Sequence, residues 1–436
     1  MELYYTFSVL IVLASFFSYL NLRYLKLPAT IGIMVIAMMV SVGIRLVGDQ
    51  FFPATTHQFF ELIRTFDFTE ILMGAMLNFL LFAGALHVNI VDLKEHKIPI
   101  ITYATISVVL SAFIISFLFF HGAALLGIQI PYIYCLLFGT LISPTDPIVV
   151  LGILKRAKVP KRIETKITGE SLFNDGVAVV MFAVVLKFAT DPTFEPTAGA
   201  ITKLFLMEAG GGVLLGALLG LTATKAMQKL NDYKVSVLIT LSIVMGGFLL
   251  AKQAHVSSPL AMVIAGLIIG NMKKTETSDK KETEKTETSD RKDTFYLSMF
   301  WELIDEIMNA ILFLFIGFEL LMLPDLTQQL VLGVVAVFIV LLARALSIFI
   351  PASTILRKST YTRGSLTTMV WGGIRGGVSI ALVMSIPNSV GGVKDVLLEV
   401  TYIVVLFSIV VQGLTVGKVA KKVLKDDTND HSTEKA

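Results

Sequence analysis

Hydrophobic and polar positions along this chain alternate on the scale of whole helices. Continuous runs rich in Leu, Ile, Val, Phe and Gly recur at lengths near the roughly 20 residues that a helix needs to cross about 30 Å of hydrocarbon. A transmembrane β-barrel would instead show segments of about ten residues with alternating polarity. The pattern therefore predicts an all-α polytopic membrane protein.

We expect about 13 transmembrane helices within a domain of residues 1–425, followed by a short cytoplasmic tail at 426–436. The first helix is expected to span the membrane, because basic residues follow its apolar core, whereas a signal peptide has them before the core. The expected spans are 3–21, 29–47, 68–88, 98–121, 131–154, 169–189, 203–226, 236–252, 257–271, 297–322, 328–350, 365–387 and 396–418.

Composition supports this reading, since 55% of the 436 residues are hydrophobic, 16% are charged, and mean hydropathy is +0.78. A soluble domain has about 25% charged residues. The expected loops place 28 Lys and Arg residues on one side of the membrane and six on the other. Because cytoplasmic loops carry the excess of basic residues, we expect a multi-pass protein of the cell membrane with its N-terminus outside and its C-terminus in the cytoplasm.

Segment 273–294 contains no apolar residue and balances seven basic against seven acidic side chains. We expect a disordered, charged cytoplasmic loop there, because nothing in the segment can be buried to offset the entropy of ordering it.

Cys135 is the single cysteine and lies within a span, so it forms no intrachain disulfide. The six histidines lack metal-site spacing, and no cofactor is expected.

Asp146 is one of few ionisable residues within an expected span, where a charge costs about 2.5–3.5 kcal/mol on insertion scales. Prolines at positions 144 and 147 remove backbone donors, so the fifth helix is expected to break near Asp146. Broken helices in membranes line protein or water, and their freed carbonyl groups can bind ions. A merely kinked helix is the alternative.

The sixth span begins with Gly169-Glu170-Ser171-Leu172-Phe173-Asn174-Asp175. Ser171 and Asp175 are four residues apart and share a helix face, as do Glu170 and Asn174. Hydroxyl and carboxylate oxygens are hard ligands that suit an alkali cation. The alternatives are an interhelical hydrogen bond from a protonated Asp175 and plain packing for Ser171 and Asn174.

The twelfth span carries several glycines around Arg375, which predicts a second break. If spans 1–6 and 8–13 are two six-helix repeats joined by the seventh, the breaks in helices 5 and 12 occupy equivalent positions in inverted repeats. Arg375 could instead extend its side chain to the cytoplasmic surface. The glycine-rich run at 210–220 lies inside an apolar helix and indicates close helix packing, not nucleotide binding.

These motifs, together with Thr145-Asp146-Pro147, Ala343-Arg344-Ala345 and Gly372-Gly373-Ile374-Arg375-Gly376, resemble the NhaP-type sodium/proton antiporters of the first monovalent cation/proton antiporter family (CPA1). The resemblance runs nearly end to end. It implies an alkali cation held by Asp175, Asp146, Ser171 and a backbone group of Thr145. It further implies that Asn174 braces the broken helix, that Glu170 pairs with Arg344 in a structural role, and that the protein forms homodimers.

The sequence departs from that family in two places. Many relatives carry an acid in the third span, where this chain has Ala83, so their ion selectivity cannot be carried over. Asn174 precedes Asp175 where electrogenic relatives have a second Asp, and Asn309 stands where they are expected to have a basic residue. The resemblance therefore implies electroneutral exchange.

We expect a secondary transporter, not an enzyme, that exchanges Na⁺, or Li⁺ or K⁺, for H⁺ by alternating access. Proton and cation would compete for Asp175, which gives one-for-one exchange. Monovalent cations, protons and the lipid bilayer are the expected partners, and nucleic acid is not. A monovalent cation channel is one alternative, and an intramembrane aspartyl protease using Asp146 and Asp175 is another.

Overall fold

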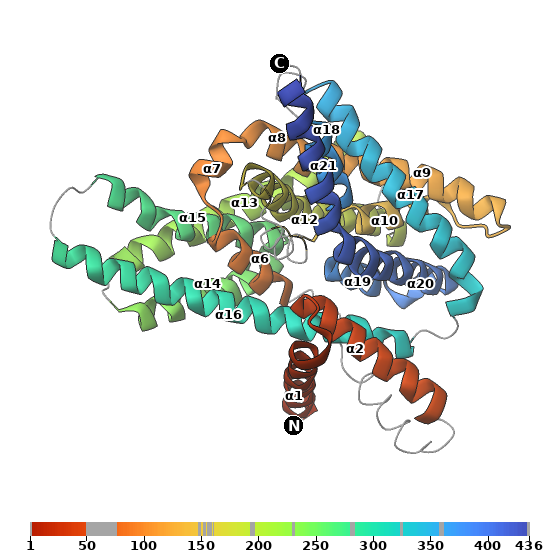
Figure 1. Cartoon of the computed structure of the whole chain (residues 1–436), viewed down its shortest axis with the longest axis horizontal. Helices are drawn as coiled ribbons and strands as arrows, with labels where there is room; N and C mark the ends of the chain where they lie inside the picture. The colour runs from red at the N-terminus through yellow and green to blue at the C-terminus, as the bar shows by residue number, and fades with distance from the viewer. Residues whose placement is uncertain are drawn as a thin grey trace.

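A computed structural model describes residues 2–48, 76–146, 161–191, 197–228, 232–279, 284–322, 326–356 and 362–433, together with Val150, Leu154 and Val159. These residues are almost entirely helical (Figure 1). The α-helices are α1 (Glu2–Leu20), α2 (Ala29–Gly43), α6 (Leu77–Leu86), α7 (Ile90–Glu95), α8 (Lys97–Thr102), α9 (Val108–Leu125), α10 (Tyr132–Ile142), α12 (Lys161–Thr190), α13 (Ala198–Gln228), α14 (Tyr233–Ala254), α15 (Ser258–Asp279), α16 (Glu284–Met322), α17 (Leu326–Ser353), α18 (Arg363–Trp371), α19 (Gly377–Met384), α20 (Gly392–Phe407) and α21 (Gly413–Thr433).

Eight helical segments within the described ranges are long and apolar enough to cross a membrane, and three shorter apolar helices accompany them. Every expected span overlaps at least one described helix, and four π-helical turns extend or join them. The all-α polytopic membrane architecture is therefore confirmed. The count of thirteen spans stays a prediction, as do their boundaries.

The helices pack into two groups (Figure 1). Helices α6, α13, α14, α15 and the first half of α16 share one hydrophobic cluster around the buried Trp301. Helices α9, α10, α17, α19 and α20 share a larger cluster with α1, α2 and the second half of α16. Helix α12 lies between the groups and contacts α10 on one side and α13 and α15 on the other.

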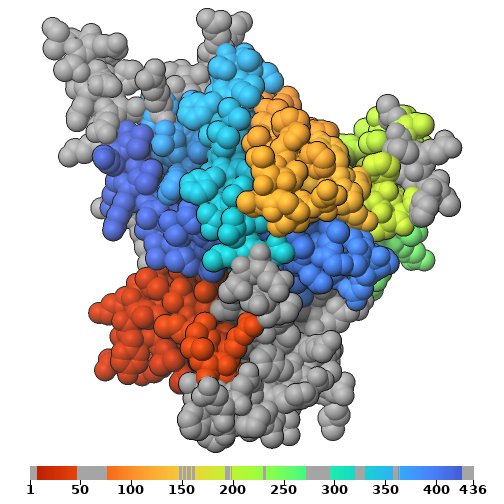
Figure 2. Space-filling view, turned by 90° about the vertical axis from the view of Figure 1, so that its right-hand side faces the viewer, coloured from red at the N-terminus to blue at the C-terminus, as the bar shows by residue number. Residues whose placement is uncertain are grey.

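One side of the second group is visible in Figure 2, where α9 in orange packs beside α17 in cyan and the red helices α1 and α2 project below.

In the first group, the glycine-rich helix α13 packs closely on α15. A Cβ on Gly216 would overlap the Ala261 carbonyl, and one on Gly212 would overlap the Ser257 carbonyl. The expected packing role of this glycine run is therefore confirmed.

The charged segment at 273–294 includes the ends of two helices, and its expected disorder and cytoplasmic position stay predictions. Helix α15 continues to Asp279 and α16 begins at Glu284, so most of the segment is helical. The physical reason is that Lys, Glu and Arg, which make up much of it, have high helix propensity, and both flanking helices are already nucleated. The polar composition of the segment did not predict the helical ends of α15 and α16.

Candidate cation site

The fifth helix breaks where the prolines predict. Helix α10 ends at Ile142, and residues 143–146 are not helical. The carbonyl groups of Ser143 and Pro144 both accept hydrogen bonds from Arg375 Nη1, at 2.8 and 3.0 Å. Hydrogen bonds to a charged donor contribute about 1.5–3 kcal/mol each, so Arg375 stabilises the buried backbone carbonyl groups that this break leaves without helical partners.

The twelfth span breaks at its glycines, between Trp371 at the end of α18 and Gly377 at the start of α19. The two breaks touch, because the Asp146 backbone N–H donates to the Ile374 carbonyl at 2.8 Å. Gly376 lies so close to Asp146 that an added Cβ would overlap the carboxylate. The kinked-helix alternative is therefore wrong, and crossed broken helices 5 and 12 are confirmed.

Arg375 is only 1% exposed. The alternative in which its side chain extends to the membrane surface is therefore wrong. Its guanidinium group is used inside the protein, where it holds the fifth-helix carbonyls in place.

Helix α12 presents its polar face to the fifth-helix break. Thr145 Oγ1 lies 2.9 Å from Ser171 Oγ and accepts a hydrogen bond from Asn174 Nδ2 at 2.8 Å. All three side chains are buried. Asn174 thus connects α12 directly to the break, as the family resemblance implied. The hydroxyl group of Thr145, and not only its backbone, belongs to this cluster.

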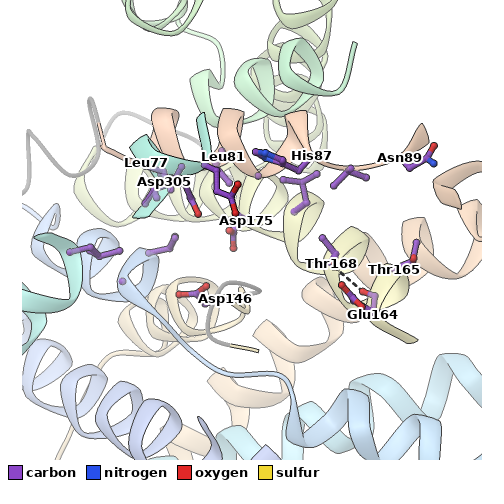
Figure 3. A pocket seen from close by; sticks show the side chains of 18 of the residues that line it. Leu77, Leu81, His87, Asn89, Asp146, Glu164, Thr165, Thr168, Asp175 and Asp305 are labelled. Carbon is purple, nitrogen blue, oxygen red and sulfur yellow. Dashed lines mark hydrogen bonds between the residues drawn. The ribbon is translucent and has the colours of Figure 1, made fainter. Parts of the chain in front are cut away.

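Asp175 and Asp146 line one cavity of about 580 Å³ and are 5% and 9% exposed. Asp175 Oδ1 has no hydrogen-bond partner among the described residues. Figure 3 shows the two carboxylates facing the same space, with Asp175 on α12 and Asp146 at the break. A buried carboxylate oxygen without a donor is costly, and an incoming proton or cation would satisfy it.

Glu170 lies one residue before Ser171 and forms a different contact. Its Oε1 is 2.5 Å from Arg344 Nη1, and both side chains are buried. Arg344 Nη2 also donates to the Met369 carbonyl on α18 at 3.2 Å. The ion pair implied by the resemblance is present, and it ties α12 to α17 and α18 beside the cation site.

Sequence reasoning missed four further acidic residues that line this cavity: Asp92, Glu164, Glu302 and Asp305. Glu302 and Asp305 lie on α16, inside an expected span, where the cost of an intramembrane charge already marked them as candidates. His87 is the one basic side chain among the described lining residues, which include neither Lys nor Arg. The cavity therefore favours cations over anions.

Ala83 and Asn309, two of the positions that depart from the family pattern, do not line the cavity. Ala83 is buried against Trp301 and its neighbours and does not line the cavity, whereas Gly84 does. Asn309 Nδ2 donates to the Asp305 carbonyl at 2.8 Å. A basic residue at position 309 would lie one helical turn from Asp305.

Comparison with known proteins agrees with this geometry. The family described as sodium/hydrogen exchanger, transmembrane, matches residues 11–422. The Na⁺/H⁺ antiporter NhaP of Pseudomonas aeruginosa is 44% identical over 421 residues, covering 95% of this chain and 96% of that protein. The Na⁺/H⁺ antiporter NhaH of Halobacillus aidingensis is 34% identical over 311 residues, covering 71% of this chain and 73% of its own length.

The fold is also that of a solved structure, the sodium proton antiporter MjNhaP1 from Methanocaldococcus jannaschii at pH 8. The two superpose with a TM-score of 0.74 at 20% sequence identity, over 97% of this chain and 100% of the other. The matched family spans nearly the whole chain and includes both broken helices and α12. The chain belongs to the sodium/hydrogen exchanger family of transmembrane proteins.

Proposed function

We propose that this protein exchanges Na⁺ for H⁺ across the cell membrane, and that both ions compete for Asp175. The observation that carries the proposal is the buried Asp175 carboxylate, which lines a cation-favouring cavity and has one oxygen without a partner in the described structure. Asp146, Thr145 and Ser171 supply further hard oxygens beside it. Na⁺ is the proposed cation because both sequence relatives are named Na⁺/H⁺ antiporters.

The competition sets the stoichiometry. A carboxylate that holds one proton or one Na⁺ carries the same net charge in both cases. If the site moves across the membrane only when loaded, each Na⁺ carried one way is matched by one H⁺ carried the other way. We therefore propose electroneutral exchange, which agrees with Asn174 and Asn309 at the positions where electrogenic relatives are expected to carry charge.

Alternating access would follow from motion of α12 and the crossed breaks against the helices across the cavity. Helix α12 and the crossed breaks carry the site, and the cavity lies between them and α6 and α16. We propose that α12 and the breaks move against α6 and α16, which closes this cavity and opens the opposite side. Asn89, Asp92 and Glu164 lie on the basic-loop side of the sequence, so the open cavity is proposed to face the cytoplasm.

The remaining assignments follow the family. Glu170 and Arg344 are proposed to maintain the structure of the site. Arg375 is proposed to compensate the backbone carbonyl groups that the fifth-helix break leaves without helical partners. The N-terminus is proposed to lie outside, the C-terminus in the cytoplasm, and the protein to act as a homodimer. Crosslinking in intact membranes tests the dimer, because it traps neighbouring copies before detergent can separate them.

Proteoliposomes test the central proposal. A Na⁺ pulse should drive counterflow of protons in wild-type protein, and Asp175→Asn should abolish it, because the amide can neither bind a proton at neutral pH nor balance a cation's charge. Asp191→Asn, directly after the far end of the same helix, is the matched control and should retain exchange. Coupled exchange by folded Asp175→Asn protein would refute the proposal, as would a sodium flux in wild type that is not tied to protons.

A further inference from the structure

The wall of the cavity that α16 forms carries an acidic residue, Asp305. The competition of ions at Asp175 does not require this residue. Asp305 lies on α16, whereas Asp175 lies on α12 and Asp146 in the fifth-helix break. Figure 3 shows these three carboxylates grouped at one end of the cavity, with Asn89, Thr165 and Glu164 toward the other end. Asp305 therefore faces the cation site from α16, across the cavity from α12.

Asp305 lines the cavity one helical turn from Asn309. Its backbone carbonyl accepts the Asn309 amide, so the helix geometry around it is fixed by a side chain one turn away. Asp305 is half-buried and Glu302, one turn earlier, is exposed, so the two form a carboxylate path from the surface toward Asp175. At the inner end of that path lies Asp175 Oδ1, which is buried and unpartnered among the described residues.

We infer that Asp305 is a specificity-determining residue that raises Na⁺ affinity only from the side to which this cavity opens. The inference rests on the proposed function. Asp305 belongs to the α16 wall, whereas Asp175 belongs to the helices proposed to move. The charge of Asp305 therefore acts on the cation site while the cavity is open. When the site faces the other side of the membrane, Asp305 stays behind on α16 and no longer acts on it. A unit charge on the wall of a water-filled cavity changes the affinity for a bound cation by about 3- to 8-fold when the effective dielectric constant is about 40–80.

The test compares half-saturating Na⁺ concentrations from the two membrane faces, in everted and right-side-out vesicles made from cells without other Na⁺/H⁺ exchange activity. At a pH above the protonation midpoint of Asp175, where protons do not compete, Asp305→Asn should raise the value about 3- to 8-fold on the cavity side and by less than about 2-fold on the other side. Glu306→Gln is the matched control, since it removes the same charge from the next position of α16, which does not line the cavity. It should leave both values unchanged. Glu302→Gln should give a smaller rise on the cavity side, because its exposed charge is screened by salt.

An Asp305→Asn protein with unchanged cavity-side affinity would overturn the inference, as would an equal rise on both sides, which indicates a general disturbance of the site. If Asp305→Asn is not recovered folded, Asp305→Ser removes the same charge with a smaller side chain and gives the same comparison. Wild-type vesicles without Na⁺-driven proton flux from either side would overturn the proposed function as well, so the two failures are distinguishable.

Discussion

The ion pair between Glu170 and Arg344 allows its contribution to stability to be worked from the structure. Glu170 is 0% exposed and Arg344 5%, so water does not replace either partner. In Glu170→Ala the Arg344 guanidinium keeps one neutral acceptor, the Met369 carbonyl. Removing one partner of a buried pair costs about 3–5 kcal/mol, because the other charge is left uncompensated.

We expect Glu170→Ala to lower the melting temperature in detergent by about 3–6 °C, since an unfolding entropy of about 2.1 cal/mol/K per residue makes 1 kcal/mol correspond to about 1 °C for a chain of 436 residues. The assay is the amount of monodisperse protein that survives heating, measured by size-exclusion chromatography. Glu306→Ala on α16, whose side chain is exposed, is the control and should stay within about 2 °C of wild type. Replacing both partners with Met should restore much of the loss, because it leaves no buried charge. A Glu170→Ala protein as stable as the control would refute the reasoning.

Two further predictions concern transport, and a third concerns the stability of the site. Gly376→Ala should reduce exchange at least about tenfold while the protein still folds, because the new Cβ overlaps the Asp146 carboxylate and displaces it by a fraction of an ångström or more. Proteoliposome flux at fixed protein amount measures this, and wild-type rates would contradict the close contact. Asn174→Ala should destabilise the protein by about 1–2 kcal/mol, because Thr145 loses its amide donor, and thermal denaturation in detergent measures the change. An imposed membrane potential should leave the exchange rate unchanged at fixed ion gradients, whereas a rate that follows the potential would contradict electroneutral exchange.

Much of this site could be predicted from the sequence, because membrane burial makes its polar residues conspicuous. Asp146 between two prolines and Arg375 among glycines indicated both breaks, and the structure adds that Asp146 N–H and the Ile374 carbonyl join them. The four-residue spacing of Ser171 and Asp175 correctly placed them on one face of α12. The Glu170–Arg344 pair joins residues 174 positions apart, and it came from family resemblance because no local pattern encodes it.

The acidic wall formed by α16 could not be predicted in the same way. Periodicity shows that Glu302 and Asp305 lie one turn apart, but it does not show which neighbouring helices that face meets. The role of position 83 was hidden for the same reason, since Ala83 faces the Trp301 cluster while Gly84 faces the cavity. The helical ends of α15 and α16 were not predicted, because the expectation of disorder considered only that the segment has nothing to bury. Lys and Glu, which are frequent in it, favour helix.

Na⁺ binding to the purified protein as a function of pH tests the central claim most directly. If one proton leaves Asp175 for each Na⁺ bound, the apparent dissociation constant should rise about tenfold for each unit of pH decrease below the protonation midpoint, and one proton should be released per Na⁺. Calorimetry in buffers of different ionisation enthalpy measures both quantities. A dissociation constant that is the same at every pH, with no proton release, would contradict the account.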